Sequence, residues 1–239
     1  YALNGNTTAS NNTAVGFSAL FSNTTGTRND AFGYQAGTAL TTGAYNTFIG
    51  ERAGTSQTTA SENTAVGSAS LSANTTGTGL VAMGKNALAA NTGSNNTAVG
   101  SRSLTTNTTG ASNTAVGKDS YANCSTGHSN CGLGFEAGQA ITTGAENVHI
   151  GYRAGDHSVG HATGSRCVII GAYADTTTTG ATDAQVIGQD VSGQGGYTTL
   201  GSGTADIRAQ NGVATWATVS DERYKKDIVD STTGLSFIN

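Results

Sequence analysis

The sequence predicts an all-β protein, an elongated parallel β-solenoid of about 12 coils. A five-residue phrase, Asn-Thr-Ala-Val-Gly, occurs at residues 12–16, 63–67, 96–100 and 113–117, and looser copies fill the intervals. A fixed period of this size is typical of solenoids. The chain also has no proline, which agrees because proline is excluded from central strands.

The last glycine of each copy, here called the anchor glycine, sets the period. Up to residue 151 these glycines recur every 17 residues, with a single interval of 16. They are Gly16, Gly33, Gly50, Gly67, Gly84, Gly100, Gly117, Gly134 and Gly151. We expect one coil of the solenoid per interval.

Composition excludes several classes of protein. Large aliphatic residues are scarce, but only 11% of residues are charged and the net charge is −4, so the chain does not have the high charge of a disordered protein. There is no basic run for nucleic acid and no apolar stretch long enough for membrane insertion. No cofactor is expected.

Positions around the anchor glycine predict which side chains are buried. The residue before it is apolar in every copy, as in Val15, Ile49 and Met83, and we expect it to face the interior. The residue three after it is always small, as in Ala19 and Ser70, which suggests a close approach to another backbone. The residue directly after it varies freely and should face solvent or a partner.

A second glycine column follows a Thr-rich segment ten residues later. It comprises Gly26, Gly43, Gly77, Gly110, Gly127 and Gly144. Glycine, Asn and Thr here predict a corner with φ > 0, and hence two corners per coil. A two-cornered coil is a flattened roll with little interior. We therefore expect its small-residue face to pack against identical chains in a homotrimer, intertwined or side by side.

The period breaks between Gly151 and Gly171, which are 20 residues apart. The extra residues fall within 156–162, near His149, His157 and His161. A metal site shared by a trimer is conceivable, but a polar loop with solvated histidines is favoured, and no metal is assigned.

Three cysteines, Cys124, Cys131 and Cys167, leave a Cys124–Cys131 bridge open. Small, buried, unpaired residues are the favoured interpretation.

The chain divides into three segments: a repeat shaft at 1–190, a neck with short β segments at 191–219, and a distinct C-terminal segment at 220–239. Within the neck, Asn211-Gly212 indicates a turn between possible strands.

The repeats, over roughly residues 4–205, resemble the heads of trimeric autotransporter adhesins. They resemble more closely the Asn-Thr-Ala-x-Gly arrays of phage-type tail fibres. Residues 220–228, Ser-Asp-Glu-Arg-Tyr-Lys-Lys-Asp-Ile, resemble the start of the self-cleaving intramolecular chaperone of endosialidases, tailspikes and L-shaped tail fibres.

This second resemblance implies that Ser220 is the nucleophile and Lys225 the base of a self-cleavage step, with Lys226 the less favoured base. A serine hydroxyl needs a neighbouring base, and a buried lysine can be one at neutral pH. The alternative is an exposed helix start with Ser220 as its N-cap.

The expected function is that of a structural, adhesive fibre on a virion surface or an extracellular appendage. Its partners would be two further copies of itself and a host receptor, a glycan or an outer-membrane component. It would not be an enzyme beyond a single-turnover cleavage of itself by the Ser-Lys dyad. The alternatives are a bacterial surface adhesin or extracellular filament subunit, a glycan-degrading tailspike and an ice-binding solenoid. The tailspike would need paired carboxylates. The ice-binding solenoid is disfavoured because the Thr residues cluster at the corners.

Overall fold

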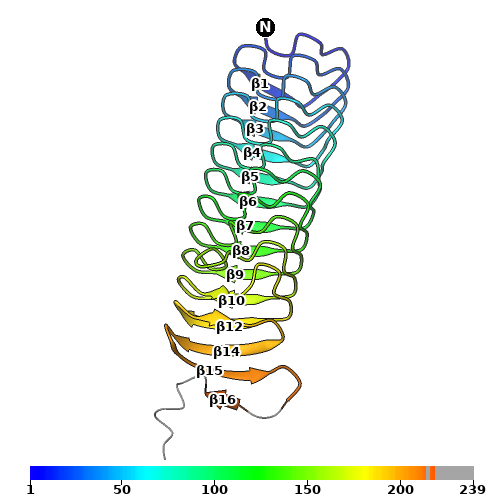
Figure 1. Cartoon of the computed structure of the whole chain (residues 1–239). Coiled ribbons are helices and arrows are strands. Elements are labelled where there is room, and N and C mark those ends of the chain that lie inside the picture. The colour runs from blue at the N-terminus through cyan, green and yellow to red at the C-terminus, as the bar shows by residue number, and fades with distance from the viewer. Residues whose placement is uncertain (214–215, 219–239) are drawn as a thin grey trace, which may run out of the picture.

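A computed structural model describes residues 1–213 and 216–218, and over these residues the chain is an all-β solenoid without a helix (Figure 1). Twelve parallel strands stack in chain order in one sheet, which gives about eleven turns between the first and the last. They are β1 (Thr13–Val15), β2 (Asp30–Phe32), β3 (Thr47–Ile49), β4 (Thr64–Val66), β5 (Val81–Met83), β6 (Thr97–Val99), β7 (Thr114–Val116), β8 (Cys131–Leu133), β9 (Val148–Ile150), β10 (Val168–Ile170), β12 (Gln185–Gln189) and β14 (Tyr197–Ser202). The predicted fold class is confirmed.

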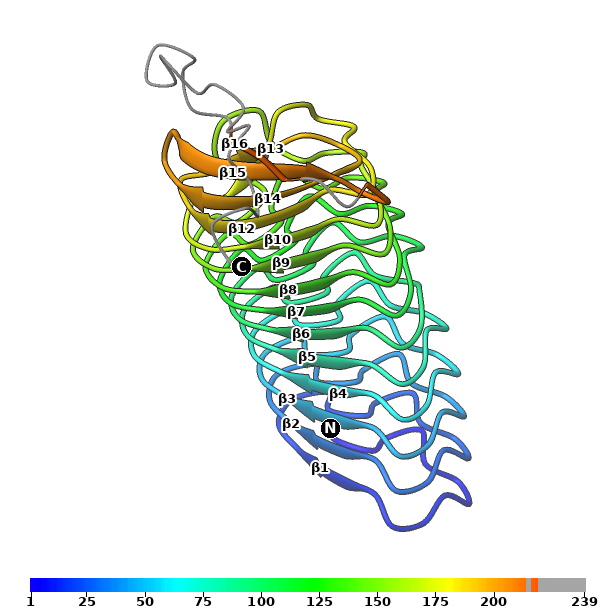
Figure 2. The same cartoon turned by 90° about the horizontal axis from the view of Figure 1, so that it is seen from below.

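The strand register reproduces the sequence period. Thr13 pairs with Asp30 and Thr97 with Thr114, each 17 residues on. The offset is 16 between β5 and β6 and 20 between β9 and β10, as the anchor spacing predicts. The strands therefore lie one above another along the sheet (Figure 2), and each anchor glycine, such as Gly100, lies against the next, here Gly117.

Each regular coil contains a single three-residue strand, and the rest of the coil is turns. Residues with positive φ interrupt it, as Arg102, Leu104 and Ser112 do at 59°, 50° and 59°. An extended strand cannot continue through such residues, so a regular coil contains no second strand in this sheet.

The anchor glycines cannot be replaced by any other residue without strain. Gly100 has a φ of 136°, and a Cβ built on it would lie 2.4 Å from the carbonyl oxygen of Gly117 in the next coil. Both the backbone conformation and the close approach demand glycine. The repeated glycine is thus a stacking requirement.

The strands correct one prediction, because the apolar residue before the anchor glycine faces outward. Val15, Ile49 and Leu133 expose 56%, 42% and 49% of their surface. The middle residue of each strand points inward instead, as the fully buried Ala65 and Ala98 do. Successive strand residues alternate in direction, and the crowded interior takes the smaller residue.

The small-residue column is also corrected, because it packs inside its own solenoid and offers no face to another chain. Ala19, Ala53 and Ser103 are fully buried beside leucines such as Leu20 and Leu104. The coil therefore has a larger buried interior than the flattened roll that the sequence analysis predicts.

Side-chain sizes inside the solenoid compensate one another. Phe48 is the one phenylalanine among the inward strand positions, and Gly37 and Gly54 lie against its ring. A Cβ at Gly54 would lie 2.5 Å from the Phe48 ring. The two glycines thus leave the space that the Phe48 ring fills.

The Asn that opens the phrase forms a buried ladder. The Asn113 side-chain carbonyl accepts hydrogen bonds from the backbone N–H of Asn130 (3.0 Å) and its side-chain amide (3.1 Å). The Asn113 amide group donates to the Gly127 carbonyl at 2.9 Å. Asn29, Asn46 and Asn147 repeat this pattern. The ladder satisfies backbone groups that the turns leave without partners.

The second glycine column does not provide a φ > 0 corner. Gly26, Gly43 and Gly110 do not have positive φ values. A Cβ at Gly43 would lie 2.0 Å from the Ala60 carbonyl oxygen, so glycine is needed there for close stacking.

The regular stack ends in an antiparallel hairpin. β15 (Ala205–Gln210) pairs antiparallel with β14, and β16 (Trp216–Thr218) pairs antiparallel with β15. Asn211 and Gly212 lie between β15 and β16, which confirms the turn expected there. A separate pair, β11 (Asp175–Thr176) and β13 (Ser192–Gly193), lies beside the last coils.

Candidate functional site

The outward face of the sheet is a long apolar surface. Its third-position residues form a continuous row, here called the apolar stripe, because each strand pairs directly with the next. The stripe comprises Val15, Phe32, Ile49, Val66, Met83, Val99, Val116, Leu133, Ile150 and Ile170.

A second outward row runs beside the stripe, at the first position of each strand. From β3 onward it carries Thr47, Thr64, Val81, Thr97 and Thr114 and then Cys131, Val148 and Val168. Among the outward positions of β1–β10 the only charged residue is Asp30. From β3 to β10 the face is therefore uncharged, and it becomes more apolar toward β10.

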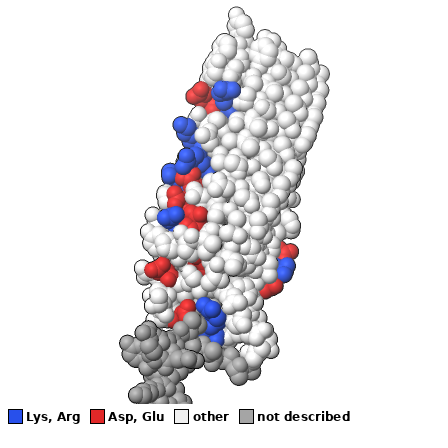
Figure 3. All heavy atoms as spheres, viewed as in Figure 1, with Lys and Arg blue, Asp and Glu red and all other residues white. Residues whose placement is uncertain are grey.

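Charged side chains gather along one edge of the solenoid, with a smaller cluster on the opposite edge (Figure 3). Arg102 of one coil binds Asp119 of the next through both carboxylate oxygens, at 2.7 and 2.8 Å, and Lys118 also contacts Asp119 at 2.7 Å. The hydrogen bond from Arg102 lowers the pKa of Asp119, although burial opposes this. The Arg102–Asp119 pair crosses from coil to coil and reinforces the stack, whereas Lys118 precedes Asp119 in the same coil.

Exposed aromatic rings near the same edge also stack along the axis. Phe135 and Tyr152 are nearly parallel, with centroids 5.3 Å apart, and Tyr173 meets Tyr152 edge to face at 5.1 Å. Lys118 lies 5.0 Å from the centre of the Phe135 ring. Because the ring faces are used for mutual contacts, these residues do not form an open stacking platform for a sugar ring.

A chain of polar side chains runs through the interior at the period break. The Tyr121 hydroxyl lies 2.6 Å from Nδ1 of His149, whose Nε2 lies 3.2 Å from Nδ1 of His161, and Nε2 of His161 lies 3.0 Å from the Ala181 carbonyl. Since a carbonyl only accepts, His161 donates from Nε2. His149 then donates to His161, and Tyr121 donates to His149. Both histidines are neutral in this arrangement.

Burial lowers the pKa of both histidines. Desolvation is the main cause at His149, and the neighbouring His161 adds to it. Desolvation also lowers the pKa of His161, while the hydrogen bond to Ala181 and the charge of Asp175 oppose the shift.

The three histidines do not form a metal site. His149 and His161 are buried, whereas His157 is partly exposed and faces Asp190 at 3.4 Å. Within residues 1–213 and 216–218 no group of three or more His, Cys, Asp or Glu side chains is placed to hold a metal ion. The expected solvated polar loop is also only partly right, because His149 and His161 point inward.

The extra residues wrap a buried carboxylate. One oxygen of Asp175 accepts backbone N–H bonds from His157, Ser158, Val159 and Gly160, at 2.8–3.2 Å. The insertion thus surrounds Asp175 with donors and serves a structural purpose.

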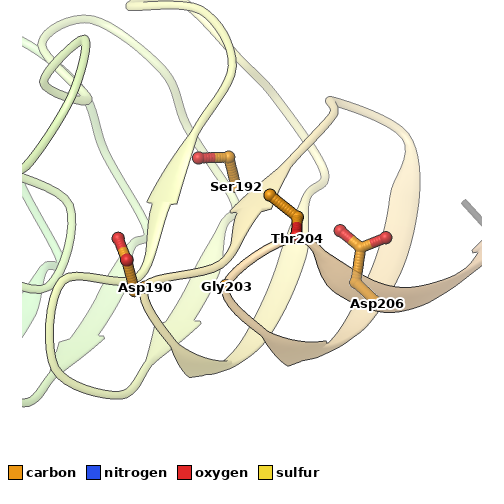
Figure 4. A pocket seen from close by; sticks show the side chains of 5 residues that line it. All are labelled: Asp190, Ser192, Gly203, Thr204 and Asp206. Carbon is orange, nitrogen blue, oxygen red and sulfur yellow. The ribbon is translucent and has the colours of Figure 1, made fainter. Parts of the chain in front are cut away.

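A hollow with a volume of about 440 Å³ lies near the C-terminal hairpin (Figure 4). Asp190, Ser192, Gly203, Thr204 and Asp206 line it. Asp190 and Asp206 stand on either side of Thr204, and Asp206 lies 3.7 Å from Arg208. Asp190 and Asp206 are the acidic residues among the five that line the hollow.

All three cysteines are free, so the Cys124–Cys131 bridge does not form. Cys124 and Cys167 are buried, and burial raises the pKa of the Cys124 thiol to about 11. Cys131 is partly exposed on the outward sheet face.

Ser220 and Lys225 lie outside the described residues. In the part of the chain that is described, no helix is long and apolar enough to cross a membrane.

A scan against protein-family models finds no match, and neither curated proteins nor solved structures show significant similarity to this chain. Sequence reasoning missed the outward stripe and the inward histidines. The alternation of Thr, Ala and Val within a strand was the signal for the first, because it places the flanking residues of each strand on one face.

Proposed function

We propose that this chain is a structural, adhesive fibre, a phage-type tail fibre or receptor-binding appendage that works as a homotrimer outside the cell or on the virion surface. The observation that carries the proposal is a long, regular solenoid with one uncharged apolar face. Contiguous apolar patches of this kind on soluble proteins mark interaction sites. Three parallel copies would present each weak receptor contact three times and so gain avidity.

The receptor would be a glycan or an outer-membrane component of the host. The chain would neither bind nucleic acid nor insert into a membrane. A bacterial surface adhesin or extracellular filament subunit remains the alternative owner, because the same rod would serve either purpose.

Light scattering tests the assembly. We expect a mass of three chains and an elongated particle in electron micrographs. A compact monomer at micromolar concentration would overturn the proposal.

Self-cleavage is a separate part of the proposal and rests on the resemblance of residues 220–228 to the intramolecular chaperone. Ser220 would attack the neighbouring peptide bond after Lys225 takes its proton. When the chain is expressed with a complete chaperone, a denaturing gel should show two bands, and Ser220→Ala should leave one. Unchanged processing of this variant would exclude the dyad.

A glycan-degrading tailspike is the competing enzyme. Glycoside hydrolysis uses two carboxylates that flank the bond to be cleaved. We expect no release of reducing sugars from host polysaccharide. Activity that disappears in Asp190→Asn or Asp206→Asn would favour the tailspike instead.

A further inference from the structure

The sheet face between β3 and β10 is not covered by any of residues 1–213 and 216–218. Its outward residues are Thr, Val, Ile, Met, Leu and Cys, and Ile49, Met83 and Leu133 are each more than 40% exposed. Strands stacked at about 4.8 Å make this face roughly 34 Å long from β3 to β10.

We infer that copies of this chain associate through this face, parallel and in register, so that each apolar stripe packs against the same stripe of its neighbours. The inference rests on the proposed fibre function and specifies its partner surface. It replaces the small-residue column, which is buried, as the surface between chains.

Charge favours a second copy as the occupant. The face carries no charged residue from β3 to β10, while the side chains of Arg102, Lys118 and Arg153 lie along the edge and are at least partly exposed. Copies that meet through this face would keep these charges in water and bury only neutral side chains. Burying a surface that has no ionic groups avoids the cost of removing charges from water.

The period favours the same occupant. The stripe has one residue per coil over eight strands, and the stripe of a second copy has the same spacing. Each stripe residue can therefore pack against its counterpart in every coil, which an irregular partner surface cannot match.

The change in polarity along the face favours a parallel over an antiparallel arrangement of the copies. Thr47, Thr64, Thr97 and Thr114, with Val81 between them, occupy its N-terminal part, whereas Val148 and Val168 replace Thr at β9 and β10. A parallel arrangement puts each Thr beside the same Thr of its neighbour, where hydroxyls can bond to one another. An antiparallel arrangement would put Thr47 against Val168 and Thr64 against Val148 and leave these two hydroxyls without partners, which is costly.

Cysteine cross-linking tests the face and the register together. In a Cys131→Ser background of the full chain, Val66→Cys (β4) and Ile150→Cys (β9) each place one thiol on the stripe. We expect mild oxidation to link Val66→Cys chains to one another, and Ile150→Cys chains likewise, on a non-reducing gel. Mixed trimers of the two variants should give no link between them. Thr109→Cys, an exposed corner residue, is the matched control and should stay unlinked.

Each other outcome overturns the inference in a distinct way. A link only between Val66→Cys and Ile150→Cys would show antiparallel packing. Trimers that link at neither position would show another contact surface, and the fibre function would survive. A chain that stays monomeric would overturn both the inference and the fibre function. If that monomer also produces thermal hysteresis, the Thr and Val rows bind ice instead.

A charge on the stripe gives a second measurement. Val99→Asp, at the outward position of β6, should raise the concentration for half-association at least tenfold, while the circular dichroism spectrum stays unchanged. Thr109→Asp should leave association as it is. Equal association of the two variants would contradict the inference.

Discussion

The coils from β1 to β8 differ from those around β9 and β10 in what fills the interior. In the first region the inward strand positions are mostly alanine, and many of the buried polar groups are asparagines, among them those of the Asn ladder. In the second region, His149 and His161 fill the interior with a hydrogen-bonded chain that begins at Tyr121. The inward strand positions from β1 to β8 thus carry no ionisable side chain, and at the period break His149 occupies such a position.

The strongest test of the regular region is an anchor glycine. Gly100→Ala should lower the free energy of unfolding by about 3 kcal/mol or more, because the new Cβ meets the Gly117 carbonyl and the φ of 136° is strained. Denaturant titration measures this change. Gly203→Ala is the control: its φ is also positive, at 57°, but nothing lies within 4 Å of the added Cβ. Equal losses would mean that φ alone matters.

The Asn ladder should come next in size. Asn113→Ala removes the acceptor for the Asn130 N–H and the donor to the Gly127 carbonyl, both buried. Unpaired buried groups cost about 1–3 kcal/mol each, so we expect a total loss of about 2–6 kcal/mol in thermal or chemical unfolding. Thr109→Ala, in the same coil but exposed, should change little. A loss below 1 kcal/mol would show that water replaces the ladder bonds.

Acid should destabilise the second region selectively. Both histidines have a lowered pKa in the folded chain and an ordinary one, about 6.5, when unfolded. Below about pH 6.5 the unfolded chain therefore binds protons that the folded chain does not. As the pH is lowered, the free energy of unfolding therefore falls by up to about 1.4 kcal/mol per pH unit for each histidine. This effect is absent above about pH 7.

His149→Phe should reduce this pH dependence. Gly138 and Gly155 lie against His149 as Gly37 and Gly54 lie against Phe48, so the site can hold a phenylalanine. Melting temperatures at pH 5 and pH 7.5 measure the effect, and His128→Gln, which is exposed, is the control. An unchanged difference between the two pH values in His149→Phe would exclude His149 as the source.

The smallest effect is expected at the exposed ion pair between Arg166 and Asp183. The two residues bond at 2.8 and 2.9 Å from coil to coil, and the pair lowers the pKa of Asp183. Because water surrounds both groups, Arg166→Gln should change the melting temperature by little more than the error of the measurement. A clear loss would show that this edge stabilises the second region.

The period, the parallel register and the break at residues 151–171 could be predicted from the sequence, because the anchor glycine marks every coil. The direction of the side chains could not be inferred from hydrophobicity alone. Val15 and Met83 are more apolar than Ala14 and Ala82, yet the narrow interior accepts the smaller residue of each strand. His149 takes the place of alanine in its strand, and only the position relative to Gly151 reveals that it points inward.

The Asn ladder makes the coils interchangeable, since each joins the next by the same few bonds. A rod built in this way can be lengthened or shortened by whole units, each adding about 4.8 Å. The number of repeats then acts as a ruler, which sets how far anything carried at one end stands from whatever holds the other.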